Sequence, residues 1–151
     1  MSYAKVIGLG GEALKEADAD VLRALIPLLP EELVRIMKQW PLIGVRISLD
    51  DMADRSRLGV EMQWMSADEI RSEATETYPG IVAVPRGYTP IGMCLDGSGD
   101  PYFYRNADGA IVRIPHDASS EDSLDESRIE VVADSVEGFL GVGSLAAVRG
   151  G

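Results

Sequence analysis

Three short stretches of this 151-residue sequence place chemically active residue types at suggestive spacings. Residues 8–13 read Gly-Leu-Gly-Gly-Glu-Ala, which matches the glycine pattern of a dinucleotide-binding turn. Residues 96–100 alternate oxygen-bearing side chains with glycine, as the start of a calcium loop does. His116 and Asp117 put a base next to an acid that could orient it. The chemistry of each stretch depends on the elements that hold it.

Two of these stretches lack features that their chemistry requires. A dinucleotide turn follows a buried strand and opens a βαβ unit, whereas residues 4–7 are barely strand-like and the next two elements are predicted to be helices. A calcium loop of the EF-hand type needs glycine at its sixth position and glutamate at its twelfth, and these positions hold Pro101 and Ala107. The sequence therefore predicts a flexible lead-in at residues 8–13 and a tight turn at residues 96–100.

The remaining candidates for catalysis or metal binding are isolated. His116 is the single histidine, and a zinc site needs further His or Cys ligands. No Gly-x-Ser-x-Gly elbow supplies a nucleophile for a triad with His116. Cys94 falls within a predicted strand, where a small buried hydrophobic role is typical. We therefore expect no enzyme activity, no metal site and no cofactor.

The first third of the chain predicts two helices. Residues 18–27 place Val21, Leu22, Leu25 and Ile26 on one face, before Pro27 ends the run. In residues 30–40, apolar side chains recur at i, i+3, i+4 and i+7, and Pro30 suits a helix start.

Strand patterns dominate the rest. Alternating apolar residues predict strands at 43–49 and 58–64, and the Ser66–Glu69 capping box predicts a helix to about Thr77. Short β-type runs follow, each bounded by turn residues. They lie at 81–84, 91–95, 102–104, 111–114 and 129–132. A short final helix is expected near Val136.

The fold class expected is α+β, with N-terminal helices followed by a mostly antiparallel twisted sheet of about six strands and helices packed on one side. We expect one domain over residues 1–151, with residues 1–11 and 141–151 loosely ordered.

The charge of the chain is unbalanced. Twenty-five acids against fourteen bases give a formal net charge of −11, and residues 117–137 hold eight of those acids against the single base Arg128. Such a surface repels phosphate backbones and suits a basic partner, although acidity also serves solubility alone. No apolar run reaches the length of a membrane span, and one cysteine allows no internal disulfide. Residues 1–7 lack the basic and apolar regions typical of a signal peptide, so we expect none there. We expect a cytoplasmic protein that binds neither membranes nor nucleic acid.

Several of these motifs together resemble the SUKH superfamily, which includes the Smi/Knr cell-wall regulators of yeast and many bacterial immunity proteins. The residues that carry the resemblance are Leu29-Pro30, Gly97 to Tyr102, Val112 to Asp117, and Ser135 to Leu140. The resemblance implies an α+β fold and a non-enzymatic immunity protein that occludes a toxin domain, often a nuclease.

A partner-binding surface is therefore the expected functional site. The acids and tyrosines predicted to form it are Asp96, Asp100, Tyr102, Tyr104, Glu121, Asp122, Asp125 and Glu126. Alternation places Tyr102 and Tyr104 on one sheet face and Phe103 on the other, so the tyrosines serve either as interface anchors or as ordinary cross-strand packing. Two alternatives remain: a regulatory or scaffold domain that binds an endogenous protein, and a small hydrolase that uses His116.

Overall fold

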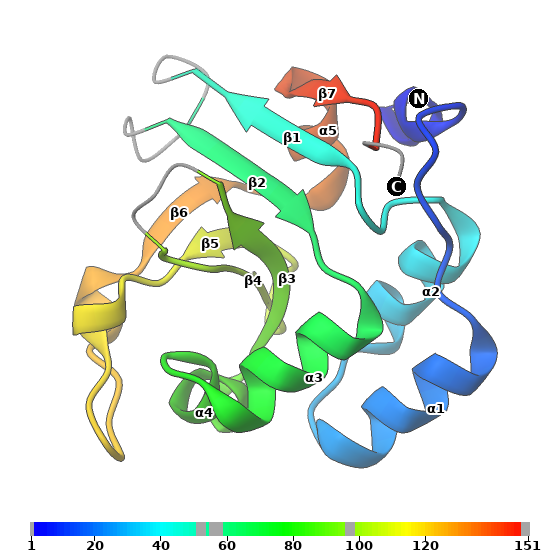
Figure 1. Ribbon diagram of the computed structural model, residues 1–151. Helices are drawn as coiled ribbons and strands as arrows, with labels where there is room; N and C mark the ends of the chain where they lie inside the picture. Colours follow the sequence, from blue (N-terminus) through cyan, green and yellow to red (C-terminus); the bar gives the residue numbers. More distant parts are fainter. Residues whose placement is uncertain (1, 51–53, 55–58, 96–98, 149–151) are drawn as a thin grey trace.

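The computed structural model describes residues 2–50, 54, 59–95 and 99–148, and these form an α+β fold (Figure 1). The helices of this part are α1 (Glu16–Leu25), α2 (Glu31–Gln39), α3 (Ala67–Glu76), α4 (Gly80–Ala83) and α5 (Val136–Val142). Four 3-10 turns accompany them: η1 (Ser2–Val6), η2 (Val84–Arg86), η3 (His116–Ala118) and η4 (Glu126–Arg128).

The strands form one curled antiparallel sheet in the order β6-β5-β4-β3-β2-β1-β7. They are β1 (Arg46–Leu49), β2 (Val60–Trp64), β3 (Tyr88–Cys94), β4 (Tyr102–Arg105), β5 (Ile111–Arg113), β6 (Glu130–Ala133) and β7 (Ser144–Ala146). The α+β class and the antiparallel sheet are confirmed, with seven strands in the described part against the about six expected. The additional strand, β7, pairs with β1 and brings residues 144–146 to the edge of the sheet.

The two faces of the sheet bury separate apolar clusters. The larger cluster packs α1, α2, α3 and α5 against one face, with Trp64, Tyr102 and Phe139 fully buried. The smaller cluster lies on the other face of β3 to β6, where Phe103 and Val112 pack against residues 114–131. The alternation predicted for β4 is therefore confirmed, because Phe103 faces one cluster while Tyr102 and Tyr104 face the other.

One predicted strand is wrong. Residues 81–84 belong to α4 and η2, between Pro79 and Pro85. Periodicity alone does not separate a buried strand from a buried helical turn in so short an apolar run. The close packing of α3 on α4 requires Gly80, since a Cβ there would lie 1.8 Å from the Glu73 carbonyl oxygen. The Glu73 carboxylate also accepts a 3.0 Å hydrogen bond from the Gly80 amide, and burial raises the pKa of Glu73.

The predicted face of the first helix is half wrong. Leu22 and Ile26 are buried, whereas Val21 and Leu25 keep 50% and 41% of their surface exposed. Helix α1 packs through Ala19 and Leu22, so Val21 and Leu25 fall at the border of its buried stripe. The helices over residues 66–77 and 30–40 are confirmed, and Ser66 and Glu69 make the predicted capping box.

Candidate partner-binding surface

The connection from β5 to β6, residues 114–129, is a structured loop on the outside of the sheet (Figure 1). Its chain is folded on itself by an antiparallel bridge between Ser119 and Leu124. Ala118 is buried, and Leu124 and Ile129 pack on the smaller apolar cluster. Apolar contacts therefore fix the base of this segment, which we call the acidic loop.

Two side chains from the α4 region hold the tip of the acidic loop through its backbone. The hydroxyl of Tyr78 donates a 3.2 Å hydrogen bond to the Glu121 carbonyl oxygen. The guanidinium of Arg86 donates to the Asp122 carbonyl oxygen and to the Val82 carbonyl oxygen, both at 2.8 Å. The tip is thus tied to α4 without the use of its own carboxylates.

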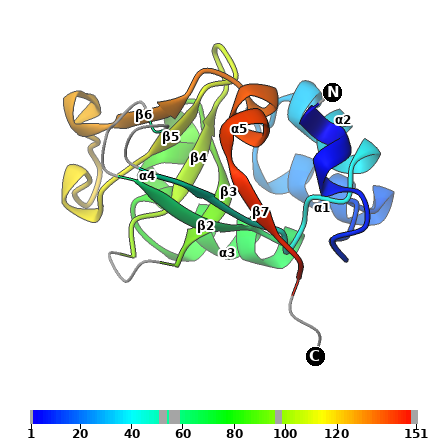
Figure 2. The same cartoon turned by 90° about the horizontal axis from the view of Figure 1, so that it is seen from above.

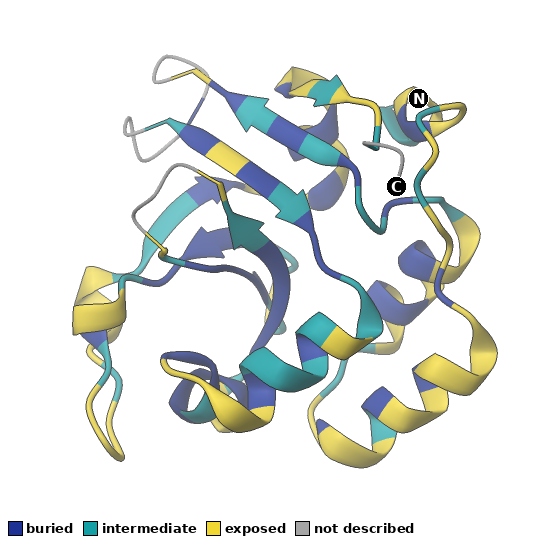
Figure 3. Ribbon diagram, in the orientation of Figure 1, coloured by how far each residue is buried: buried dark blue, intermediate teal, exposed yellow. Residues whose placement is uncertain are grey.

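The four acids predicted in this loop, Glu121, Asp122, Asp125 and Glu126, are all exposed, as is most of the loop (Figure 3). Within the described chain, no hydrogen bond or ion pair engages the carboxylates of Glu121 and Asp122. The Asp125 carboxylate accepts bonds from the Ser127 amide at 3.1 Å and hydroxyl at 2.6 Å, which caps η4. These contacts leave the negative charges of Glu121, Asp122 and Asp125 without a basic partner.

Glu126 links the acidic loop to the sheet. Its carboxylate accepts a 3.0 Å hydrogen bond from the Tyr88 hydroxyl. Burial, together with this bond and the charge of Glu126, raises the pKa of Tyr88 to about 12. One cation pairs directly with a loop carboxylate among the described residues: Arg128 lies 2.9 Å from Asp117. The loop therefore keeps a strong negative charge in a fixed backbone shape.

The two predicted tyrosines lie elsewhere. Tyr102 is fully buried and Tyr104 is 6% exposed, both in the cluster on the sheet face opposite the acidic loop. The Tyr102 hydroxyl accepts a 3.1 Å hydrogen bond from the guanidinium of Arg113, which also bonds Glu130 at 2.8 Å and the Gly59 carbonyl oxygen at 2.8 Å. Burial alone would lower the pKa of Arg113, but the bonds to Glu130 and Tyr102 raise it. Cross-strand packing is thus the role that the structure gives both tyrosines.

Asp100 binds His116. Its Oδ1 atom accepts from the His116 amide at 3.0 Å and lies 2.8 Å from the ring Nδ1. Asp117, the sequence neighbour that could have oriented His116, instead pairs with Arg128. Asp100 therefore joins the start of β4 to η3 at the base of the acidic loop. Asp96 lies outside the described residues.

Among the described residues, the surroundings of His116 supply no activated nucleophile. The Ser119 hydroxyl donates a 3.0 Å bond to the His116 carbonyl oxygen, and in the part of the chain that the structure describes no hydroxyl or thiol is bonded to the imidazole ring. Nor do the described residues bring together three His, Cys, Asp or Glu side chains that could hold a metal ion. Tyr78, His116, Ser119 and Glu121 instead line an open hollow of about 380 Å³. A hollow rimmed by hydroxyls and a carboxylate has donors and acceptors for one polar or basic side chain.

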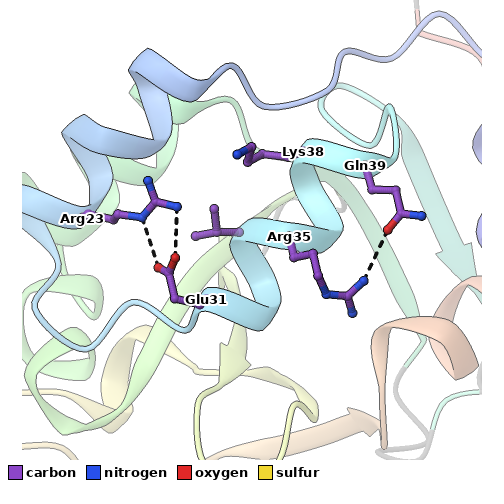
Figure 4. Close-up of a pocket in the computed structure, with 6 residues that line it drawn as sticks. Arg23, Glu31, Arg35, Lys38 and Gln39 are labelled. Carbon is purple, nitrogen blue, oxygen red and sulfur yellow. Dashed lines mark hydrogen bonds and ion pairs between the residues drawn. The ribbon is translucent and has the colours of Figure 1, made fainter.

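A second charged region has a different composition. Between α1 and α2, a cavity of about 470 Å³ is lined by Arg23, Glu31, Arg35, Lys38 and Gln39, among others (Figure 4). Its bases are paired with acids: Arg23 lies 2.9 Å from Asp20, 3.0 Å from Glu31 and 3.2 Å from Glu16. Lys38 also contacts Glu16, and Arg35 contacts Glu32. The hydrogen bonds from Lys38 and Arg23 lower the pKa of Glu16. This cavity is consequently near electrical neutrality.

The residues that tie down the acidic loop were not found from the sequence. Tyr78 and Arg86 stand 43 and 36 positions from their partners, so no local pattern connects them. Because residues 81–84 were wrongly predicted to be a strand, the sequence also gave no indication that the acidic loop lies close to α4.

None of the described helices is both long and apolar enough to cross a membrane. Comparison with models of known protein families finds no match for this chain, and comparison with curated protein sequences finds none either.

Proposed function

We propose that this protein is a non-enzymatic binding domain that takes up a basic protein partner on the acidic loop. The observation that supports this most strongly is the separation of backbone anchoring from charge. Tyr78 and Arg86 hold the loop by carbonyl oxygens, so the backbone of Glu121 and Asp122 is held in place while their carboxylates stay available.

Electrostatic complementarity explains how such a surface works. Opposite potentials speed diffusional encounter and select against acidic competitors. The net charge of −11 extends this field beyond the loop itself. A lysine or arginine of the partner can enter the hollow beside Tyr78 and Glu121.

The partner that the SUKH resemblance implies is a toxin domain, and the role is that of a cytoplasmic immunity protein. A nuclease toxin carries a basic cleft for nucleic acid, and an acidic protein surface competes for that cleft. An endogenous regulatory partner would use the same loop, so the identity of the captured protein separates the two roles.

A pull-down from source-cell lysate and secretome tests the proposal, at about 50 and about 500 mM salt. We expect a basic protein to be captured at low salt and released at high salt, because contacts between exposed charges are screened. The Glu121→Gln/Asp122→Asn variant should lose this capture. The Glu12→Gln/Glu137→Gln variant removes the same charge elsewhere on the surface and should retain it. Equal capture by both variants, or no salt-sensitive capture, would count against the proposal.

A further inference from the structure

An apolar groove of about 340 Å³ is lined by residues from the end of α1, α3 and the α4–η2 segment. In the ribbon, the α4 region lies between α1 and the acidic loop (Figure 1). Its lining includes Leu25, Pro27, Leu28, Ile81, Val84 and Pro85. Leu25 and Leu28 keep 41% and 52% of their surface exposed. Single exposed leucines are ordinary, but large apolar side chains gathered around one groove are typical of an interaction site.

The same chain segment, residues 78–86, lines the groove and holds the acidic loop. Pro85 lines the groove, and the next residue, Arg86, holds the Asp122 carbonyl oxygen. Ile81 lines the groove as well, three residues after Tyr78, which holds the Glu121 carbonyl oxygen. Residues 78–86 therefore border an apolar surface on one side and support an acidic surface on the other.

The charges around the groove favour a basic occupant. On the adjoining acidic loop, the carboxylates of Glu121 and Asp122 have no hydrogen-bond or ion-pair partner within the described chain. The nearby base Arg71 is offset by Asp68 at 3.7 Å and Glu76 at 3.6 Å. A second copy of this chain, at −11, and an anionic membrane would both be repelled.

The walls of the groove favour a helical occupant. The edge strands of the described sheet are β6 and β7, and neither lines the groove. An extended peptide would find no strand to pair with there, and its backbone groups would stay unpaired. A helix satisfies its own backbone hydrogen bonds and presents apolar side chains at i, i+3, i+4 and i+7.

We propose that the groove binds the apolar face of an amphipathic helix from another protein, whose lysines or arginines contact the acidic loop. This inference rests on the proposed function, because it assigns the partner of the same loop a shape and an apolar anchor. Leu25 and Leu28 supply the apolar contact, and Glu121 and Asp122 the charged one.

Fluorescence anisotropy with the whole chain and two labelled peptides tests this inference. The first peptide, of about 14 residues, carries leucines at helical spacing among lysines and alanines. The second has the same composition in an order without an apolar face. We expect the first peptide to bind about tenfold more tightly than the second. Leu25→Ser/Leu28→Ser should remove that advantage, whereas Val142→Ser, a change at a 59% exposed residue of α5, should keep it.

The outcomes separate this inference from the proposed function. Equal affinity for the two peptides, or an unchanged preference in Leu25→Ser/Leu28→Ser, would overturn the groove. If Glu121→Gln/Asp122→Asn still weakened both peptides, the acidic loop would keep its role. If Leu25→Ser/Leu28→Ser lost the preference for the first peptide while Glu121→Gln/Asp122→Asn bound both peptides with unchanged affinity, the groove would be supported. The contact assigned to the acidic loop would then be refuted. Leu28→Lys, which repels the lysines, provides a second variant, and circular dichroism establishes that each variant is folded.

Discussion

The two strongly charged regions of the protein use their basic side chains in different ways. They lie at opposite sides of the molecule, with the acidic loop in yellow to orange and α1 and α2 in blue to cyan (Figure 2). On the α1–α2 side, Arg23 contacts three carboxylates, and Arg35 and Lys38 each contact one. On the loop side, Arg86 donates to carbonyl oxygens instead.

This difference shows how position decides what an acid does. Paired acids on the α1–α2 side join two helices and leave little net field. Acids held by their backbone keep their charge available to a partner. Similar numbers of carboxylates thus give a largely neutralised surface in one place and a negatively charged surface in the other.

The largest effect expected is loss of the support beneath the acidic loop. In Gly80→Ala, the new Cβ would lie 1.8 Å from the Glu73 carbonyl oxygen, so α4 must move away from α3 and take Tyr78 and Arg86 with it. We expect the free energy of unfolding to fall by about 3 kcal/mol, measured by denaturant titration. Gly138→Ala, at an exposed position of α5, meets no atom closer than Ser135 Oγ at 3.2 Å and should cost little.

A smaller effect is expected when one anchor is cut and every loop carboxylate is kept. Arg86→Met removes the bonds to the Val82 and Asp122 carbonyl oxygens. Amide hydrogen exchange at Ser120, whose N–H bonds the Ser123 carbonyl oxygen, should become faster by about tenfold. Arg35→Met removes a base that contacts a carboxylate and should leave Ser120 unchanged. Similar exchange in both variants would show that Arg86 does not hold the loop.

The contact between Tyr88 of the sheet and Glu126 should make the free energy of unfolding fall at alkaline pH. Because burial and Glu126 raise the pKa of Tyr88 from 10 to about 12, the folded state favours the protonated hydroxyl. This contribution is complete below pH 10 and is lost as pH rises through about 12. Tyr88→Phe should reduce this alkaline loss and lower neutral-pH stability by about 1 kcal/mol, followed by denaturant titration at several pH values. An identical alkaline profile in the variant would refute this role.

The smallest effect is expected on the α1–α2 side. Arg23→Gln breaks contacts with Glu16, Asp20 and Glu31, all of them exposed. We expect a small drop in thermal midpoint that disappears at about 0.5 M salt, since exposed pairs are weak and screened. A large, salt-independent loss would mean that this face depends on more than exposed ion pairs.

The sequence predicted elements that local signals define. The Ser66 capping box located α3, and alternation assigned Phe103 and Tyr102 to opposite faces. The sequence also located the acids of the loop, because residues 117–137 hold eight acids and a single base.

The sequence could not predict what depends on distant packing. Both faces of β4 are covered, so Tyr102 and Tyr104 are core residues, and an aromatic pattern is the same whether a face is covered or free. The bond from Arg86 to Asp122 spans 36 positions and involves a carbonyl oxygen, which has no residue signature. The groove at Leu25 and Leu28 arose because the packing of α1 left part of its apolar face uncovered.

The most direct test of the account compares two variants with the same change in net charge. Glu121→Gln/Asp122→Asn neutralises two acids of the loop, and Glu16→Gln/Glu32→Gln neutralises two of the paired acids of the α1–α2 side. The measurement is the association rate constant for the basic partner recovered by pull-down, at about 50 mM salt. The account predicts about a tenfold decrease for the loop variant and less than about a twofold decrease for the helix variant. Equal decreases would contradict it, because binding would then follow net charge and not the acidic loop.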